Sequence, residues 1–231
     1  MSAGRQRGFD REQALDRAAK LFWRDGYQGM SVDEFLEATG TSRASFLAAY
    51  GDKERLFRAA VVHYVAGPGS YVRRALERPQ AAEAIGALLL DAAAAFASTE
   101  HPPGCLVVHG ALASGEEDAL ARDLLLSQRL TWQTEIRARL ERGVADGEMP
   151  VGTNVVMMAE YVMTVLNGMA VQALAGADRA ALTAVAELAL RAMDVSEPAA
   201  ATPRKRGRGP ARGSVKQAKS DGLAGQLAMD L

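Results

Sequence analysis

Cys105 and His109 are the residues whose types and spacing come closest to supporting covalent chemistry. They lie four positions apart, so they share one face of a helix. Cys105 directly follows Pro102-Pro103-Gly104, where the pattern predicts a helix start, and a helix N-terminus lowers the pKa of a thiol. A redox or electrophile-processing helical protein that uses Cys105 is one function that this arrangement would suit. The alternative is a small buried thiol beside a hydrogen-bonded histidine, which needs no chemistry.

No further enzyme signature accompanies this pair. Nucleophilic catalysis needs an oriented base and an oxyanion site, and the sequence carries the signature of neither. Walker, zinc-protease and nucleophile-elbow motifs are also absent. One cysteine in 231 residues excludes a disulfide framework or a Cys-rich zinc cluster, and it fits a reducing cytoplasm. We therefore expect no metal, no cofactor and no enzymatic activity.

The composition is that of a folded cytoplasmic protein, with 48% hydrophobic and 24% charged residues. The first residues lack the apolar stretch of a signal peptide. Residues 155–177 are long enough to cross a membrane, but Glu160, Asn167 and Gln172 interrupt them. Because a carboxylate at mid-membrane is costly, we expect a helix buried inside the protein or between two copies of it, with no membrane partner.

The net charge of −1 conceals an uneven distribution along the chain. Residues 61–195 are acidic, whereas residues 196–231 and, weakly, residues 1–60 are basic. An acidic centre is unsuited to polyanions, and basic flanks are suited to them. We therefore divide the chain into three parts at residues 60 and 195.

Residues 1–60 contain the start and stop signals of four short helices. Polar residues that can cap a helix precede each apolar stripe, and glycines follow the first two. These signals are Asp10 with Gln13 before Gly26, Ser31 with Glu34 before Gly40, Thr41 or Ser42 before residues 43–49, and Asp52 before a fourth helix.

The second and third of these helices, joined by a short turn at Gly40, match a helix-turn-helix. So short a third helix cannot be stable alone, so Phe46 or Leu47 must pack on its neighbours. Its N-terminal edge is then free to enter a major groove, where an arginine can reach guanine or a phosphate. The alternative is an ordinary three-helix bundle. The residues on the free edge are Thr41, Ser42, Arg43 and Ser45.

A longer pattern favours the DNA-binding alternative. The spacing of its residues resembles the DNA-binding domain of TetR-family transcriptional regulators. The matching segments are Phe9-Asp10, Ala14-Leu15, Leu21-Phe22-Trp23, Gly26-Tyr27, Ser31-Val32-Asp33, Ala38-Thr39-Gly40, Ser42-Arg43-Ala44-Ser45, Gly51-Asp52-Lys53-Glu54 and Leu56-Phe57.

The resemblance implies an all-α homodimer that binds double-stranded DNA through residues 1–60. Lys53 matches a family lysine that contacts a phosphate, and Arg5 and Arg7 precede the first helix as an arm. Where many members have a tyrosine after the position of Phe46, this chain has Leu47, and Tyr50 is the nearest phenol. The predicted DNA-binding residues are Arg5, Arg7, Ser31, Thr41, Ser42, Arg43, Ser45, Tyr50 and Lys53.

Residues 61–195 carry further helical patterns and no strand pattern, which predicts a helical bundle. The expected helices cover residues 71–77, 80–98, 105–113, 117–146, 154–175 and 178–194. The last two are apolar on more than one face, so they need burial against a partner. A second copy, packed about a two-fold axis, matches a palindromic operator.

An unidentified small-molecule effector is expected in the same part, chiefly because the family usually holds one there. Some members sense electrophiles through a cysteine in this region, so the expected function is a repressor released by a ligand or by thiol modification. Plain core packing is the alternative for each pliable or aromatic residue. The predicted effector residues are Phe96, Cys105, His109, Trp132, Met158 and Met163.

Residues 196–231 form a basic tail in which residues 198–213 lack apolar bulk and are expected to be disordered. Residues 203–210 resemble an AT-hook with one inserted glycine, and their cations can add salt-sensitive phosphate affinity. The alternative is a solubilising tail. The cations are Arg204, Lys205, Arg206 and Arg208.

Overall fold

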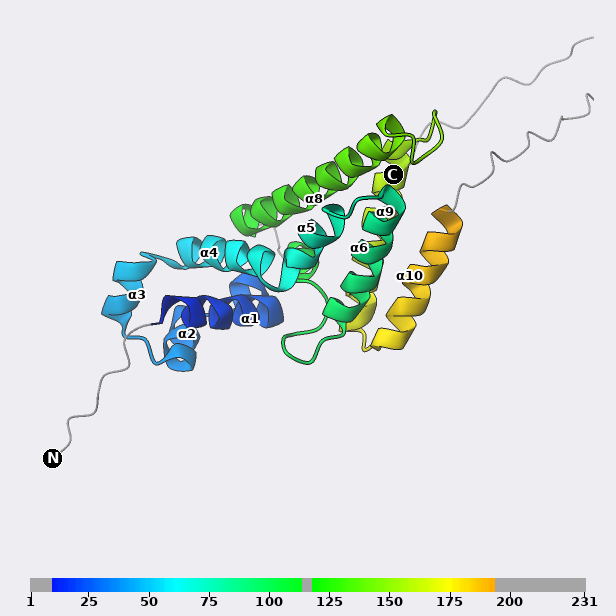
Figure 1. The fold of residues 1–231 in the computed structure, drawn as a ribbon. Helices are drawn as coiled ribbons and strands as arrows, with labels where there is room; N and C mark the ends of the chain where they lie inside the picture. Colours follow the sequence, from blue (N-terminus) through cyan, green and yellow to red (C-terminus); the bar gives the residue numbers. More distant parts are fainter. Residues whose placement is uncertain (1–9, 114–117, 194–231) are drawn as a thin grey trace, which may run out of the picture. The chain divides into compact units, whose positions relative to one another are not determined.

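The structure, a computed structural model, describes residues 10–113 and 118–193, and every regular element in these ranges is helical (Figure 1). This confirms the all-α fold. The described residues lie in one compact unit that spans residues 1–195. The helices are α1 (Arg11–Gly29), α2 (Val32–Thr39), α3 (Arg43–Ala49), α4 (Lys53–Ala66), the 3₁₀ helix η1 (Pro68–Ser70), α5 (Tyr71–Leu76), α6 (Ala81–Phe96), α7 (Leu106–Ala113), α8 (Ala119–Ala145), α9 (Val155–Leu174) and α10 (Arg179–Met193).

Two groups of predicted DNA contacts lie outside the described residues and stay predictions. The first is the N-terminal arm with Arg5 and Arg7. The second is the basic tail with Arg204, Lys205, Arg206 and Arg208.

Side chains cap the first turn of each of α1 to α4, where backbone N–H groups have no helical partner. Asp10, Ser31, Ser42 and Asp52 accept hydrogen bonds from N–H groups two or three residues on, at 2.8–3.2 Å. Ser42 is therefore the cap of α3, a choice that the sequence left open between it and Thr41.

The predicted capping box at the start of α2 is only half formed. Ser31 accepts from the Glu34 N–H as expected. The Glu34 carboxylate does not return to the Ser31 backbone but accepts a 2.6 Å hydrogen bond from Arg24 Nη2 of α1. This exchange ties α2, and with it α3, to the long first helix.

Helix α4 continues from the predicted DNA-binding part into the rest of the chain. Its buried stripe consists of Leu56, Phe57, Ala60, Val61 and Tyr64. The boundary that we place at residue 60 falls inside α4, so one helix spans both predicted parts. Beyond it, residues 67–70 end the helix and α5 follows, as the sequence predicts.

The later helices form the expected bundle, in which α6 packs against α5, α8, α9 and α10. Helix α9 is the one helix among residues 10–113 and 118–193 that is long and apolar enough to cross a membrane by length and composition. It packs against α6, α7, α8 and α10, yet only 33% of its most apolar stretch is buried. An apolar face of α9 therefore remains exposed.

A single hydrophobic core runs from α1 to α10. Its largest fully buried side chains include Trp23, Phe57, Tyr64 and Phe96. Because protein interiors are close-packed, a rearrangement among the later helices can reach α1 and α4 through these side chains.

Candidate nucleic-acid interface

Phe46 anchors the short helix α3. Its side chain is 2% exposed, and its ring centroid lies 5.9 Å from that of Phe35 of α2. Leu47, the other predicted anchor, is 54% exposed. The side of α3 away from Phe46 is therefore free, and its exposed residues are Ser42, Arg43, Ala44, Ser45, Leu47 and Ala48.

Tyr50 belongs to the same aromatic cluster, and its contact with DNA stays a prediction. Its side chain is 5% exposed, and its ring lies 6.1 Å from Phe35 and 6.0 Å from Phe46. The Arg11 guanidinium covers the ring at 5.8 Å. To meet a phosphate, the phenol would have to leave this cluster, so we leave Tyr50 out of the proposed DNA contacts.

Arg43 stands at the first residue of α3, with 60% of its side chain exposed. Its Nη2 donates to Asp33 Oδ1 on the first turn of α2. This ion pair links the first turn of α2, which Ser31 caps, to the first residue of α3. The hydroxyl oxygens of Ser42 and Ser45 lie 2.9 Å apart on the same edge.

Lys53 is the first residue of α4, and its Nζ lies 4.5 Å from the centroid of the Tyr27 ring. Burial lowers the pKa of its ammonium group, and the Asp118 carboxylate acts in the opposite direction. The backbone N–H groups at a helix N-terminus favour an anion. A phosphate at this end of α4 would therefore meet both these groups and the Lys53 cation.

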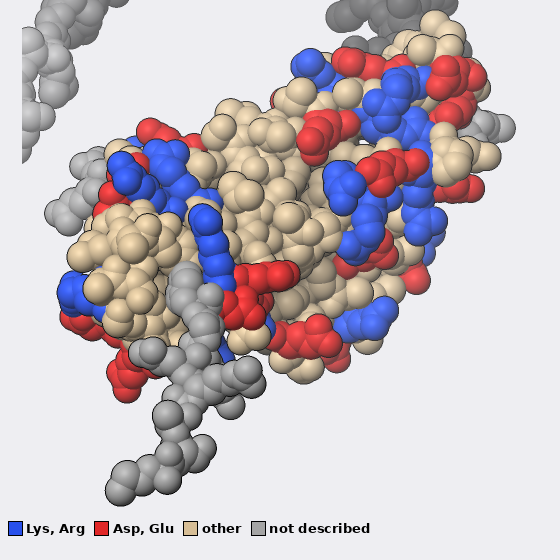
Figure 2. Space-filling view, turned by 60° about the vertical axis from the view of Figure 1, so that its left-hand side comes forward, with Lys and Arg blue, Asp and Glu red and all other residues tan. Residues whose placement is uncertain are grey.

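The charged side chains around this surface are mixed in sign. Figure 2 brings forward the left-hand side of Figure 1, where α2 and α3 lie, and basic and acidic side chains stand side by side on the face in view. Asp10, Asp33 and Asp52 are among the exposed acidic residues of this region. Non-specific affinity for DNA grows with the number of phosphates that cations neutralise. A few directed contacts therefore matter more here than a broad positive surface.

A second cluster joins α1 and α4 to the loop before α7. The Trp23 indole Nε1 donates to the carbonyl oxygen of Pro103 at 3.1 Å, and its ring stacks on His101 at 4.5 Å. Tyr64 packs edge-on against Trp23 at 4.9 Å and donates its hydroxyl to Cys105 Sγ at 3.2 Å. The loop over residues 101–105 is thus fastened to α1 and α4.

Burial also changes the chemistry expected of Cys105. Its side chain is 1% exposed, and burial raises the pKa of its thiol, while the hydrogen bond from Tyr64 acts in the opposite direction. Helix α7 does begin at the next residue, but the loss of solvent outweighs the helix N-terminus. The prediction of a lowered thiol pKa is wrong, and the redox or electrophile-processing function loses its main support.

Known proteins share both parts of this chain. A sequence profile described as "Bacterial regulatory proteins, tetR family" matches residues 14–60, and one described as "Tetracyclin repressor-like, C-terminal domain" matches residues 81–189. The HTH-type transcriptional repressor ComR of Escherichia coli (strain K12) is 30% identical over 192 residues, which cover 82% of this chain and 91% of ComR. The chain belongs to the TetR family.

Solved structures of TetR-family regulators agree with this assignment. CifR, a TetR family transcriptional regulator solved as a cysteine mutant with 26-base-pair double-strand operator DNA, is 42% identical. The match has a TM-score of 0.77 and covers 82% of this chain and 100% of the CifR chain. A second curated repressor, BdcR of Escherichia coli (strain K12), is 28% identical and aligns over 80% of this chain and 90% of its own.

In this TetR-family chain, most of the predicted effector residues lie in the core. Phe96, Cys105, Trp132 and Met163 are at most 6% exposed, whereas His109 and Met158 are half-buried. Phe96 also packs edge-on against Tyr71 at 5.9 Å. Their contact with an effector stays a prediction.

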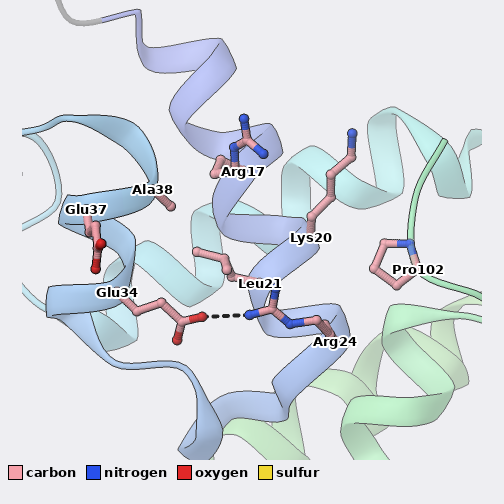
Figure 3. A pocket seen from close by; sticks show the side chains of 8 residues that line it. All are labelled: Arg17, Lys20, Leu21, Arg24, Glu34, Glu37, Ala38 and Pro102. Carbon is pink, nitrogen blue, oxygen red and sulfur yellow. Dashed lines mark hydrogen bonds and ion pairs between the residues drawn. The ribbon is translucent and has the colours of Figure 1, made fainter.

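A cleft of about 370 Å³ lies elsewhere, between α1 and α2 (Figure 3). None of the six predicted effector residues lines it. The Arg24–Glu34 ion pair crosses it, and its charged lining is unsuited to an apolar effector. The lining residues are Arg17, Lys20, Leu21, Arg24, Glu34, Glu37, Ala38 and Pro102.

Several residues of these two regions escaped prediction as functional. Asp33 lies ten positions before Arg43, and no local pattern joins an acid on one helix to a base on the next. No local pattern predicts the contacts of Trp23 and Tyr64, because the carbonyl and thiol that they contact lie 80 and 41 residues away.

The backbone conformation and close packing of Gly104 explain why a glycine precedes Cys105, and they lead to a prediction about stability. The φ of Gly104 is +78°, and an added Cβ would lie 2.7 Å from the Ala170 carbonyl oxygen of α9. We expect Gly104→Ala to lower the free energy of unfolding by about 2–4 kcal/mol, from the left-handed backbone and the clash together. Urea denaturation measures this.

Gly86 of α6 provides the matched control. An added Cβ there meets nothing within 4 Å, and the residue lies inside a helix. Gly86→Ala should therefore raise the free energy of unfolding by about 0.5–1 kcal/mol. Equal effects of the two substitutions would show that the approach of Gly104 to α9 is unimportant.

Proposed function

We propose that this protein is a homodimeric cytoplasmic transcriptional repressor that leaves a palindromic operator when an effector occupies its later helices. Two copies of α3 would enter major grooves one or two helical turns apart, at about 34–36 Å per turn. The DNA-bound dimer then blocks transcription until the spacing between its two copies of α3 changes.

The anchoring of α3 carries this proposal. Phe46 is buried and the opposite side of the helix is exposed, so a base-reading edge faces solvent on a fixed support. CifR, which is 42% identical, is solved in complex with operator DNA, and this supports a DNA-binding role for this chain.

The polar residues of α3 and of the neighbouring helix starts have proposed roles. Arg43 reads the O6 and N7 atoms of a guanine. Ser42 and Ser45 allow close approach, with Ser31 and Thr41 at the margin of the contact. Lys53 holds a phosphate at the start of α4.

A second copy would cover the exposed faces of α9 and α10. Met157, Tyr161, Thr164, Gly168 and Val171 are exposed at spacings of three and four along α9. Helix α10, which packs beside it, repeats the pattern with Ala181, Val185, Leu188 and Ala192. Such stripes interdigitate when helices pair, and the two-fold axis of the pair matches a palindrome.

The loop over residues 101–105 gives a route for release. It is fastened to α1 by the Trp23–Pro103 hydrogen bond and to α4 by the Tyr64–Cys105 hydrogen bond. An effector that shifts α7 would therefore move α4 and change the distance between the two copies of α3. Coupling of only about 1.4 kcal/mol lowers DNA affinity tenfold. The buried thiol favours a bound ligand over thiol modification as the signal.

Binding to duplexes that the wild-type protein selects from a random-sequence library tests the proposal. The selected sequences should be palindromic, and Arg43→Ala should weaken binding by about 1–3 kcal/mol per guanine contact. Arg73→Ala is the matched control, because Arg73 is also an exposed arginine paired with an acid but lies on α5. Its titration curve should match that of the wild type.

Two results would contradict the proposal. A library that yields no enriched duplex at any salt concentration would remove the DNA-binding function. Selected sites that Arg43→Ala and the wild type bind equally would remove α3 as the reader.

A further inference from the structure

The position of Arg43 is electrostatically unfavourable within its own helix. It is the first residue of α3, and the N-terminus of a helix carries a partial positive charge that favours anions over cations. No local pairing offsets this, since the first turn of α3 contains no acidic residue. A cation kept at such a place points to a partner outside the helix.

Asp33 of α2 supplies that partner. Its Oδ1 accepts from Arg43 Nη2, which joins the first turns of the two helices. Asp33 is itself well placed, because an acidic residue in the first turn of a helix is favoured there. The carboxylate therefore has a fixed origin on α2, from which it holds the arginine of α3.

This ion pair does not serve to stabilise the fold. The side chains of Arg43 and Asp33 are 60% and 80% exposed, and pairs in such positions contribute little to stability. A surface carboxylate close to DNA also repels phosphates. The pairing has a clearer purpose in recognition, where it sets both the charge and the direction of Arg43.

We propose that Asp33 is a positioning and specificity-determining residue that stays bound to Arg43 on DNA and directs its remaining N–H groups to a guanine. The proposal rests on the proposed function, since it assumes that α3 reads bases. The carboxylate neutralises the charge of Arg43 and so weakens its attraction to a phosphate. Arg43 therefore adds little affinity for non-cognate DNA. A guanine is recognised by directed hydrogen bonds, and an arginine with one N–H engaged still has four to offer.

The Asp33→Asn variant of the full-length protein tests this. It removes the charge and keeps the size of the side chain. Affinity for a non-specific duplex, poly(dI-dC), should rise about 3- to 10-fold, and the slope of log affinity against log salt should steepen by about 0.9 per protomer. Affinity for the duplex selected by the wild type should rise less or fall, so the ratio of specific to non-specific affinity drops.

Two controls separate positioning from net charge. Glu37→Gln removes an exposed acid from the same helix, one turn further on, and should leave the ratio unchanged. In an Arg43→Ala background, Asp33→Asn should have no effect on the ratio, because the residue through which it acts is gone.

The outcomes distinguish a failure of the Asp33 role from a failure of the repressor function. If Asp33→Asn leaves the ratio as it is, or if Glu37→Gln lowers it equally, the role of Asp33 is wrong while the repressor function stands. If Asp33→Asn still changes the ratio in the Arg43→Ala background, the role of Asp33 is also contradicted. If the wild-type protein itself selects no duplex, the proposed function fails first.

Discussion

A Leu188→Asp variant should be monomeric and should bind the selected operator at least about 100-fold more weakly, because the second half-site no longer benefits from a linked partner. Leu188 is 62% exposed on α10, within the stripe that we assign to the dimer. A carboxylate there would be buried without a partner on association, which is costly. Analytical ultracentrifugation measures the mass, and fluorescence anisotropy measures the affinity.

Leu130 of α8 provides the control for this substitution. It is the same residue type, 63% exposed, and lies outside the stripes of α9 and α10. Leu130→Asp should remain a dimer and bind DNA normally. If Leu188→Asp stays dimeric, or if only Leu130→Asp dissociates, the dimer face lies elsewhere on the bundle.

The helices were predictable wherever their signals are local. Asp10, Ser31 and Asp52 cap helices because a side-chain oxygen and the N–H groups that it meets are two or three residues apart. The same holds for the stripe of α4, whose buried residues repeat with helical spacing. All the residues of such a pattern lie within one helix, so the pattern can be recognised from the sequence without knowledge of the fold.

The prediction of a lowered Cys105 pKa failed because it depends on neighbours from distant parts of the chain. Cys105 does stand directly before the N-terminus of α7. Tyr64 and the surrounding core nevertheless exclude water from its thiol, and no sequence pattern near residue 105 reveals this burial. The DNA contact of Tyr50 stays a prediction, and only the positions of Phe35 and Phe46 reveal that its ring is buried. Burial and partner choice are tertiary properties, and they decide the site.

The choice between Phe46 and Leu47 is the sharpest case, and it leads to the last prediction. Both are large apolar residues on a seven-residue helix, and spacing alone cannot say which one faces the core. Phe46 is 2% exposed and Leu47 54% exposed. Phe46→Ala should therefore lower the free energy of unfolding by about 3–5 kcal/mol, whereas Leu47→Ala should change it by less than about 0.5 kcal/mol.

The Phe46→Ala substitution should also abolish sequence-specific DNA binding. Isolated helices of this length are not stable in water, so α3 depends on the contact between Phe46 and Phe35 for its shape. At a temperature where urea denaturation shows Phe46→Ala still folded, it should bind the selected duplex no better than poly(dI-dC), while Leu47→Ala keeps its preference for the selected sequence. Equal stability of the two variants would mean that α3 is held by something other than its buried ring, and the reading edge built on that anchor would then lose its support.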